Sequence, residues 1–229
     1  MNVKDIYSLF QKTKGVVTDT RLSVENSFFV ALKGKNFDGN NFAEEAIKKG
    51  ASYALVNIEV KSKNNNKFIY VNDTLKTLQK LANYHRKIIK TKIIAITGSN
   101  GKTTTKELLN EILSKEFKTF ATEGNLNNHI GVPLSLLNIK KECGYAVIEL
   151  GANHIGEIKE LCEIAEPDFG LITNFGYAHL EGFGSFQGVI KGKSELYDYI
   201  TGKKGRIFIN VDDPIQEKWL KYNPISTYG

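Results

Sequence analysis

One segment of the chain, residues 93–104, constrains the fold more than any other. It reads Ile-Ile-Ala-Ile-Thr and then Gly-Ser-Asn-Gly-Lys-Thr-Thr. The apolar run predicts a buried strand, and a glycine-containing turn then leads into a helix, which is typical of a parallel α/β sheet. Gly98 and Gly101 would let backbone N–H groups wrap around a phosphate at the positive end of that helix. The segment therefore predicts a phosphate-binding loop.

Two side chains of this loop have specific expected roles. Lys102 would reach the β- and γ-phosphates of a nucleotide, and the Thr103 hydroxyl would ligate Mg²⁺. Ile96 stands where the general phosphate-loop pattern has its first glycine, so the spacing departs from that pattern. We expect the loop to bind ATP through Gly98, Ser99, Asn100, Gly101, Lys102, Thr103 and Thr104.

A boundary near residues 90–92 separates a small α/β unit from a region in which strands and helices alternate. Before it we expect helices at 3–11 and 42–49, a long helix capped by Asp73 and Thr74, and strands at 28–32, 53–56 and 68–71 around a polar loop at 61–67. After it we expect strands at 93–97, 118–122, 145–150, 170–173 and 206–211, and helices at 103–113, 156–165, 186–200 and 215–220. The prediction is a small α/β domain at 1–90 and a mostly parallel-sheet domain at 91–229.

Composition excludes several classes of protein. Hydrophobic residues make up 41% of the chain and charged residues 24%, which excludes a disordered tail, a collagen-like fibre and a coiled coil. No apolar stretch approaches ~18 residues, and the first residues lack the apolar core of a signal peptide, so no membrane insertion is expected. Cys143 and Cys162 offer neither a disulfide framework nor metal-ligand spacing. A cytoplasmic location is the simplest interpretation.

The charge balance bears on the kind of partner. Lys and Arg number 31 and Asp and Glu 25, a net charge of +6. The chain has just three arginines, and its lysines are scattered along predicted helix faces, whereas nucleic-acid binders concentrate basic residues among Arg or aromatic side chains. We expect no nucleic-acid partner. A modest positive field suits a polyanionic small molecule such as a nucleotide.

The loop at 97–103 is the variant found in the Mur ligase family, the ATP-dependent amide-forming enzymes of peptidoglycan precursor synthesis. Further segments resemble this family in the same order: Gly-Asn-Leu-Asn-Asn-His-Ile-Gly-Val-Pro at 124–133, Glu-Leu-Gly-Ala-Asn-His-Ile-Gly-Glu at 149–157 and Ala-His-Leu-Glu-Gly-Phe-Gly-Ser at 178–185. They are most similar to members that add D-Ala-D-Ala to UDP-N-acetylmuramoyl-tripeptide. Ligases that add the third amino acid look different after the loop and after the metal-binding Glu. Folylpolyglutamate synthases share the loop but not these segments.

The amino-terminal part is similar to the family's UDP-sugar-binding domain. The similar segments are Thr-Asp-Thr-Arg at 18–21, the apolar run at 28–32 and Gly-Lys-Asn-Phe-Asp-Gly at 34–39. In two places the chain departs from the family: Asn40 replaces a common His, and Glu-Asn-Ser at 25–27 replaces a Pro-Gly-Asp turn. The resemblance implies that the uridine and diphosphate lie near Thr20, Arg21, Lys35 and Asn36. Without it, Arg21 would be interpreted as a surface residue and 34–39 as a turn.

The resemblance also implies a reaction and a set of metal ligands. ATP would activate a carboxylate as an acyl phosphate, and an amine would then attack it to give an amide, with ADP and phosphate released. Two anions must approach each other, so two Mg²⁺ ions would neutralise charge together with Lys102. The expected catalytic residues are Lys102, Glu149, His179 and Lys193, and the expected metal ligands are Thr103, Glu149, His179 and Lys193.

The residues themselves support these roles to different degrees. Glu149 follows a predicted strand at the carboxyl edge of the sheet, where ligands of open α/β folds collect, although an exposed strand-end acid is the alternative. By periodicity His154 and His179 would be structural histidines. The resemblance instead makes His179 the ligand of the second Mg²⁺ and places His154 in the site lining.

Lys193 begins the sequence Lys-Ser-Glu-Leu-Tyr, which resembles the family segment whose lysine reacts with CO₂. The carbamate so formed is an anion that can ligate Mg²⁺, and its formation needs a neutral amine. Lys191 has the wrong spacing to the Leu-Tyr pair. Without the family match, a solvated lysine would be the interpretation.

Several asparagines are candidate binding residues. A turn with a helix N-cap is the local interpretation of the segment at 125–128, whereas the resemblance favours substrate binding there. The expected substrate contacts in this part of the chain are Asn125, Asn127, Asn128, Asn153 and His154. Asn210, in Asn-Val-Asp-Asp after a strand, resembles the family's adenine-side segment.

The implied substrates are UDP-N-acetylmuramoyl-tripeptide and D-Ala-D-Ala, and the implied state is a monomer. The family has three domains, whereas the motifs here account for two, and the chain stops within a strand that resembles one of the central domain. We therefore expect this chain by itself not to be a working ligase, because orientation of the reactants needs the third domain. The alternatives are the ligase that adds the third amino acid and a non-catalytic UDP-sugar- and nucleotide-binding fragment.

Overall fold

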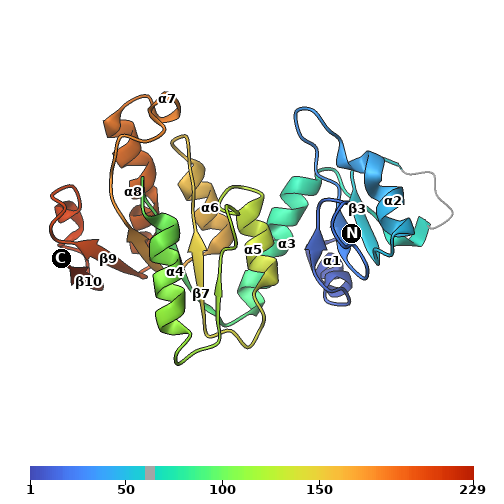
Figure 1. The fold of residues 1–229 in the computed structure, drawn as a ribbon, viewed down its shortest axis with the longest axis horizontal. Coiled ribbons are helices and arrows are strands. Elements are labelled where there is room, and N and C mark those ends of the chain that lie inside the picture. Colours follow the sequence, from blue (N-terminus) through green and yellow to red (C-terminus); the bar gives the residue numbers. More distant parts are fainter. Residues whose placement is uncertain (60–64) are drawn as a thin grey trace. The chain divides into compact units, whose positions relative to one another are not determined.

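The computed structural model describes residues 1–59 and 65–229, which form two compact units, Met1–His85 and Arg86–Gly229 (Figure 1). Each unit contains its own sheet, and every strand pair in both sheets is parallel, which confirms the predicted α/β class. The polar loop predicted at 61–67 lies partly outside the described residues. Within the described ranges, no helix has the length and apolar character needed to cross a membrane.

The first unit has a four-stranded sheet in the order β1-β2-β3-β4. Its strands are β1 (Val16–Val17), β2 (Phe28–Val30), β3 (Tyr53–Val56) and β4 (Phe68–Tyr70). Its helices are α1 (Val3–Phe10), α2 (Ala43–Lys48), the short η1 (Gly39–Phe42) and η2 (Asn65–Lys67), and α3 (Thr74–Ile88), whose last residues belong to the second unit. Phe29 packs in one core with Ala46 and Ile47 of α2, whereas Phe28 meets the ring of Phe10 from α1. Asp73 caps α3 as predicted, because its carboxylate accepts the N–H of the third helical residue at 2.8 Å.

The second unit has a six-stranded sheet in the order β10-β9-β8-β5-β7-β6. The strands are β5 (Lys92–Thr97), β6 (Thr119–Ala121), β7 (Tyr145–Glu149), β8 (Phe169–Ile172), β9 (Arg206–Asn210) and β10 (Ile225–Tyr228). The helices are α4 (Lys102–Leu113), α5 (Gly131–Asn138), α6 (Glu157–Ala165), α7 (Leu180–Phe183) and α8 (Phe186–Gly202). Later strands add to opposite sides of β5, so the strand order reverses there. In open α/β sheets, ligands bind at the carboxyl ends of strands beside such a reversal.

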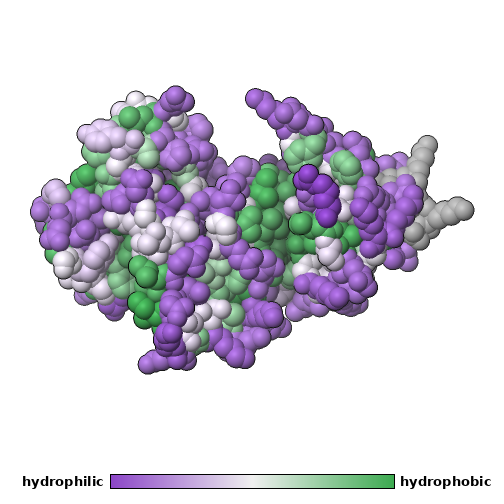
Figure 2. Space-filling view, in the orientation of Figure 1, coloured by the Kyte–Doolittle hydropathy of each residue, from purple (hydrophilic) through white to green (hydrophobic). Residues whose placement is uncertain are grey.

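Helices cover both faces of this sheet (Figure 1). On one face, Leu109 and Leu113 of α4 pack against Ile94, Ile96 and Val147 of the sheet. On the other face α8 lies so close to β8 that a Cβ on Gly170 would stand 2.4 Å from a methyl of Ile200. Two apolar side chains on the outer side of α4 reach solvent: Leu108 and Ile112 are 60% and 66% exposed, and hydrophobic surface is visible beside this helix in Figure 2.

The predicted helix at 215–220 is wrong apart from one short turn, η3 (Glu217–Trp219). The buried side chain of Gln216 explains the difference, because it makes tertiary hydrogen bonds that hold this segment in turns. Its Oε1 accepts from the Tyr197 hydroxyl at 3.1 Å and from the Asn210 N–H at 3.2 Å, and its amide donates to the Ile172 carbonyl at 3.2 Å.

Two short α-helices and one short strand have no counterpart among the predicted elements. The helix α5 carries Gly131 and Pro133 in its first turn, where proline is tolerated although both residues lower helix propensity. The helix α7 and the strand β1 are too short to give a periodic signal.

Candidate functional site

The phosphate loop leaves the carboxyl end of β5, at the point where the strand order reverses. Its two glycines are required for different reasons. Gly98 has φ +149°, and a Cβ there would stand 1.8 Å from the Thr173 Oγ1. Gly101 has φ +76° with open space around it, so backbone conformation alone selects glycine at this position. The loop can therefore approach its neighbour, and a ligand, with bare backbone.

The segment that follows β8 is hydrogen-bonded to the phosphate loop and fixes its backbone. Asn100 is bound on both its backbone groups: its carbonyl accepts from the Thr173 hydroxyl at 2.6 Å, and its N–H donates to the Asn174 Oδ1 at 3.1 Å. The Ser99 hydroxyl accepts the N–H of Gly176 at 2.8 Å. Thr173, Asn174 and Gly176 were not among the predicted site residues. The available signal was their place directly after the strand next to β5.

Glu149, at the end of β7, is 2% exposed and lies against the start of α4. The Thr103 hydroxyl donates to its Oε2 at 3.0 Å, and the Asn127 amide donates to its Oε1 at 2.8 Å. The backbone N–H of Glu149 donates to the Thr122 Oγ1 at 3.0 Å. The structure thus brings together three of the predicted residues: Thr103 from α4 (the phosphate helix), Asn127 from the loop at 122–130 (the asparagine loop) and Glu149 from β7.

Two lysines, one at the start of α4 and one in α8, converge on the phosphate loop. The ammonium groups of Lys102 and Lys193 each donate to the Gly98 carbonyl at 2.9 Å. Burial, and then the nearby charge of Lys102, lower the pKa of Lys193 to about 8. Burial also lowers the pKa of Lys102, against the opposing effect of the Glu149 charge. Two ammonium groups on one carbonyl make this spot strongly electropositive and attractive to phosphate or carboxylate.

A cavity of about 370 Å³ opens beside these groups. Its lining includes Lys102, Asn127, Asn153 and His179, so the phosphate-loop lysine, two predicted substrate residues and one of the four predicted metal ligands meet around one cavity. His179 has a left-handed backbone, φ +57°, and is exposed where α7 begins. It contributes its imidazole from the rim.

Two other predicted site residues make local structural bonds, and a third is exposed. Asn128 Oδ1 accepts the N–H groups of Ile130 and Gly131, so it caps the start of α5 as the local interpretation predicts. His154 pairs with Glu157 at 3.0 Å on the exposed start of α6. Asn125 is exposed in the loop before Asn128.

Asn210 lies at the carboxyl end of β9, away from the phosphate loop. In the sheet order β8 separates β9 from β5. The Asn210 Oδ1 accepts the N–H of Asp212 at 3.0 Å, and this bond shapes the turn after β9. Asn210 therefore lies at the edge of the sheet where ligands of open α/β folds bind, one strand farther from the phosphate loop than β8.

The oxygen donors beside the phosphate loop determine whether a divalent cation fits there. Across the described parts of the chain, no group of three or more His, Cys, Asp or Glu side chains could hold a metal ion. Mg²⁺ does not require such a cage, because it usually takes one or two carboxylates, water and substrate phosphates. Glu149 and the Thr103 hydroxyl supply oxygens of the preferred kind next to the phosphate loop. The residues present fit Mg²⁺.

The first unit has a cavity of about 510 Å³ that is lined in part by Thr20 and Arg21. Hydrogen bonds from Arg21 lower the pKa of Asp19 to about 2. Lys35 and Asn36 are exposed and are not among its lining residues. The sequence analysis missed two aromatic residues that line this cavity, and both remain largely exposed: Phe37 and Phe42.

Asn40, which departs from the family's His, is buried in this unit and acts as a structural bridge. Its amide nitrogen donates to the Asp38 carboxylate at 2.6 Å and to the Asn57 side chain at 2.7 Å. Its Oδ1 accepts the N–H of Asn57 at 3.1 Å. These bonds join the turn after β2 to the end of β3.

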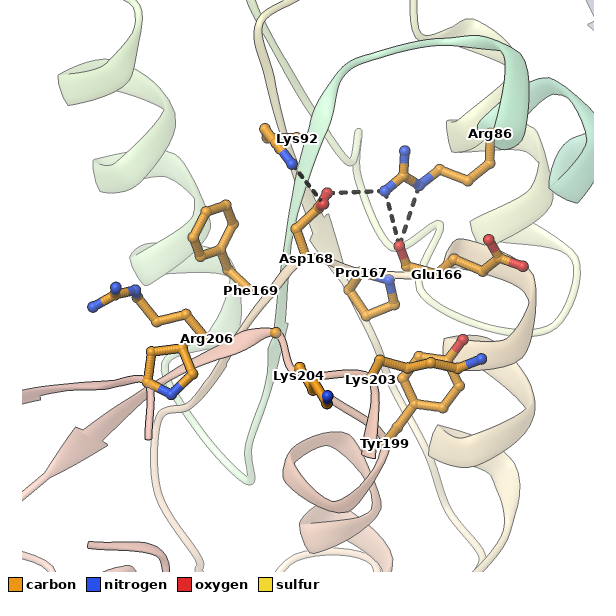
Figure 3. Close-up of a pocket in the computed structure, with 12 residues that line it drawn as sticks. Arg86, Lys92, Glu166, Pro167, Asp168, Phe169, Tyr199, Lys203, Lys204 and Arg206 are labelled. Carbon is orange, nitrogen blue, oxygen red and sulfur yellow. Dashed lines mark hydrogen bonds and ion pairs between the residues drawn. The ribbon is translucent and has the colours of Figure 1, made fainter. Parts of the chain in front are cut away.

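A further cavity of about 500 Å³ lies where the strands of the second unit begin, around Lys92 and Arg206 (Figure 3). Asp168 accepts from the Arg86 guanidinium at 2.9 Å and from the Lys92 ammonium at 3.1 Å. Arg86 also donates to the Glu166 carbonyl at 2.9 Å. Asp168, Arg86 and Lys92 are thus paired with one another at the edge of the sheet opposite to the phosphate loop. This network therefore stabilises the fold.

The fold and the site together define a nucleotide-binding protein with a phosphate loop on a parallel sheet. Comparison with known families is more specific. The profile of the Mur ligase middle domain matches residues 96–229, and that of the Mur ligase family catalytic domain matches residues 12–91. The chain belongs to the Mur ligase family.

Curated relatives agree with this assignment. The UDP-N-acetylmuramoyl-tripeptide–D-alanyl-D-alanine ligase of Bacillus subtilis is 39% identical over 216 residues, covering 94% of this chain and 47% of the relative. The ligase of the same name from Haemophilus influenzae is 43% identical over 208 residues, covering 89% of this chain and 45% of the relative. The chain spans about half the length of the curated relatives it matches.

Solved structures are similar over nearly the whole chain. A crystal structure of MurF from Acinetobacter baumannii has a TM-score of 0.86 and 36% identity, covering 99% of this chain and 52% of that chain. The MurF ligase of Thermotoga maritima in complex with ADP has a TM-score of 0.82 and 35% identity, covering 94% of this chain and 49% of that chain. The UDP-N-acetylmuramoyl-L-alanyl-D-glutamate–2,6-diaminopimelate ligase, at 20% identity and a TM-score of 0.56, shares the fold alone.

Proposed function

We propose that this chain carries the nucleotide site and the UDP-sugar site of a ligase that joins D-Ala-D-Ala to UDP-N-acetylmuramoyl-tripeptide with ATP. The observation that carries the proposal is the buried Glu149 carboxylate, hydrogen-bonded to Thr103 at the phosphate loop. Its support is the 39% and 43% identity to curated relatives of that name. Residues 1–90 would form the UDP-sugar domain and residues 91–229 the ATP domain.

The chemistry requires a carboxylate to approach a triphosphate. A carboxylate oxygen of the UDP-linked peptide attacks the γ-phosphorus, ADP leaves and an acyl phosphate forms. The amine of D-Ala-D-Ala then attacks the acyl carbon, phosphate leaves and the amine loses a proton. Lys102 and the N–H groups between Gly98 and Gly101 would hold the charge that accumulates on the phosphoryl oxygens. Mg²⁺, when bound, would supply further charge neutralisation.

Within this proposal, Thr103 and Glu149 hold the first Mg²⁺ and His179 holds a second one from the cavity rim. Hydrogen bonds support the first assignment, because the Thr103 hydroxyl and the Asn127 amide orient the Glu149 carboxylate beside the phosphate loop. The second assignment depends on the resemblance and on the place of His179 in the same cavity as Lys102. Asn127 and Asn153 would face the peptide substrate from that cavity.

Lys193 is proposed to carry a carbamate. Its neutral amine would attack CO₂, forming a nitrogen–carbon bond and releasing a proton. Supporting this, the side chain is buried and its pKa is lowered to about 8, which enlarges the neutral fraction at neutral pH. With ¹³C-labelled bicarbonate we expect a carbamate NMR signal that Lys193→Ala abolishes and Lys191→Ala, at an exposed position, retains. Absence of the signal in the unmodified chain would contradict the carbamate.

The cavity of the first unit is proposed to take the uridine diphosphate. Exposed rings at Phe37 and Phe42 offer flat apolar surface for a uracil base, and Arg21 offers charge for the diphosphate. We assign Thr20 to the same contact, because it lines the cavity. Lys35 and Asn36 would approach the ligand from the adjacent turn.

Calorimetric binding tests the function in this chain. We expect binding of UDP-N-acetylmuramoyl-tripeptide and, with Mg²⁺, of ADP. Preference for the UDP-linked dipeptide would indicate the ligase that adds the third amino acid. Binding of neither UDP-linked peptide nor nucleotide would refute the proposal. Amide formation is tested with D-Ala-D-Ala in a chain of the relatives' full length.

A further inference from the structure

Lys106 is the single fully buried residue of α4, with 1% of its surface exposed. It lies one helical turn after Lys102, and the sequence analysis gave it no role. An ammonium group in such a place is unfavourable unless hydrogen bonds or charges compensate it. Its partners therefore show what the side chain does.

The Lys106 ammonium has two partners. It donates to the carbonyl of Thr122, and it lies 2.9 Å from a carboxylate oxygen of Glu107. Glu107 is 62% exposed, so water screens that ion pair at one end. The bond to Thr122 lies in the interior and connects the phosphate helix to the residue directly after β6.

Thr122 connects the end of β6 to β7 and to Glu149 by hydrogen bonds. Its N–H donates to the Val147 carbonyl at 3.0 Å, and its hydroxyl accepts the Glu149 N–H at 3.0 Å. The asparagine loop, defined as residues 122–130, starts here and carries Asn127, which donates to the Glu149 carboxylate at 2.8 Å. Lys106 thus binds the first residue of a loop that contacts Glu149 at two positions, Thr122 and Asn127.

We propose that Lys106 is a positioning residue that keeps Glu149 and the asparagine loop in register with the phosphate loop. This rests on the proposed role of Glu149 in Mg²⁺-nucleotide binding. Thr103 and Lys106 belong to the same helix, so one rigid element fixes the carboxylate directly and fixes its supporting loop through Thr122. Without the ammonium, the buried Thr122 carbonyl loses a partner and the loop base relaxes toward other donors.

The competing explanation is that Lys106 serves only the stability of α4, through its pairing with Glu107. Three substitutions separate the two explanations. Lys106→Met keeps the length and removes both bonds, Lys106→Arg keeps a long donor, and Glu107→Gln removes the ion pair while leaving the Thr122 bond intact.

The first experiment uses calorimetry to measure two quantities. One is the Mg²⁺ midpoint, the Mg²⁺ concentration at which ADP binding is half enhanced, and the other is the ADP affinity without metal. For Lys106→Met we expect the midpoint to rise about tenfold or more, the scale on which groups that orient metal ligands act. We expect the metal-free affinity to stay unchanged, Lys106→Arg to restore most of the loss, and Glu107→Gln to behave as the unmodified chain does.

The second measurement is amide hydrogen exchange over residues 122–130 and at Glu149, which requires no ligand. We expect faster exchange there in Lys106→Met and unchanged exchange in Glu107→Gln. An unchanged Mg²⁺ midpoint with unchanged exchange in Lys106→Met would overturn the proposal, as would equal effects of the two substitutions.

Two further outcomes remain interpretable. If Lys106→Met fails to fold, Lys106→Gln takes its place, since its shorter amide reaches Thr122 poorly, and the same comparisons apply. If the unmodified chain binds no Mg²⁺-ADP, the proposed function fails, whereas the exchange measurement still tests whether Lys106 positions the loop.

Discussion

Replacement of Gly98 by alanine tests the geometry of the phosphate loop most directly. The new Cβ would stand 1.8 Å from Thr173 Oγ1 and 3.1 Å from Thr173 Cβ. Thr173 has little room to retreat, because its hydroxyl donates to the Asn100 carbonyl at 2.6 Å. The backbone at φ +149° is also strained for any residue with a Cβ.

Both effects destabilise the second unit. Overpacking contributes about 1–3 kcal/mol, and backbone strain contributes about 1–3 kcal/mol, so the free energy of unfolding should fall by about 2–6 kcal/mol. At about 2–4 °C per kcal/mol for a chain of this size, Tm should fall by at least about 4 °C. The loop backbone must shift to relieve the clash, so ADP affinity should fall by at least about tenfold, or 1.4 kcal/mol.

Thermal unfolding followed by circular dichroism and calorimetric titration with ADP measure the two effects. Gly124→Ala is the matched control, because Gly124 has φ +53° with nothing within 4 Å of an added Cβ. That variant should lose about 1 kcal/mol through backbone strain and keep its ADP affinity. Adding Thr173→Ala to Gly98→Ala should restore part of the stability. If Gly98→Ala matches the unmodified chain in Tm and ADP affinity, the loop geometry is wrong.

Further predictions concern the charged groups of the site. Lys102→Ala should lose productive nucleotide binding with its circular dichroism spectrum unchanged; equal ADP affinity would refute its phosphate role. Glu149→Ala and His179→Ala should each weaken the Mg²⁺ dependence of ADP binding, and identical Mg²⁺ titrations would exclude them as ligands. Because burial lowers the pKa of Lys193 from 10.5 to about 8, its charge opposes folding below pH 8 and ceases to do so above pH 10.5. Urea unfolding should therefore show stability rising between these pH values by up to about 3 kcal/mol relative to Lys193→Met, and parallel pH profiles would contradict this.

The asparagine loop shows how one residue type can serve structure and site together. Asn128 caps α5 through its Oδ1, whereas Asn127, its neighbour in sequence, turns toward Glu149. A Cβ on Gly151 would stand 2.8 Å from the Asn127 side chain, so glycine at that position leaves room for the amide. The local pattern predicts the cap, but it carries no information on the carboxylate partner.

Sequence alone determined those features that depend on neighbouring residues. The strand before the phosphate loop, the helix after it, and the Asp73 cap of α3 follow from apolar periodicity and from the conformations that glycine and capping side chains allow. The family assignment also came from sequence, because its motifs are short and local.

The tertiary structure decided which of these motifs meet. Thr103 and Glu149 are 46 residues apart, and Lys193 and Gly98 are 95 apart, and their contacts exist because β5 lies between β7 and β8 in the sheet. Strand order results from packing over the whole unit, which no local pattern encodes. The same reason explains the wrong helix at 215–220, where buried hydrogen bonds of Gln216 outweigh helix propensity, and the missed role of Lys106, whose partner Thr122 comes from another strand end.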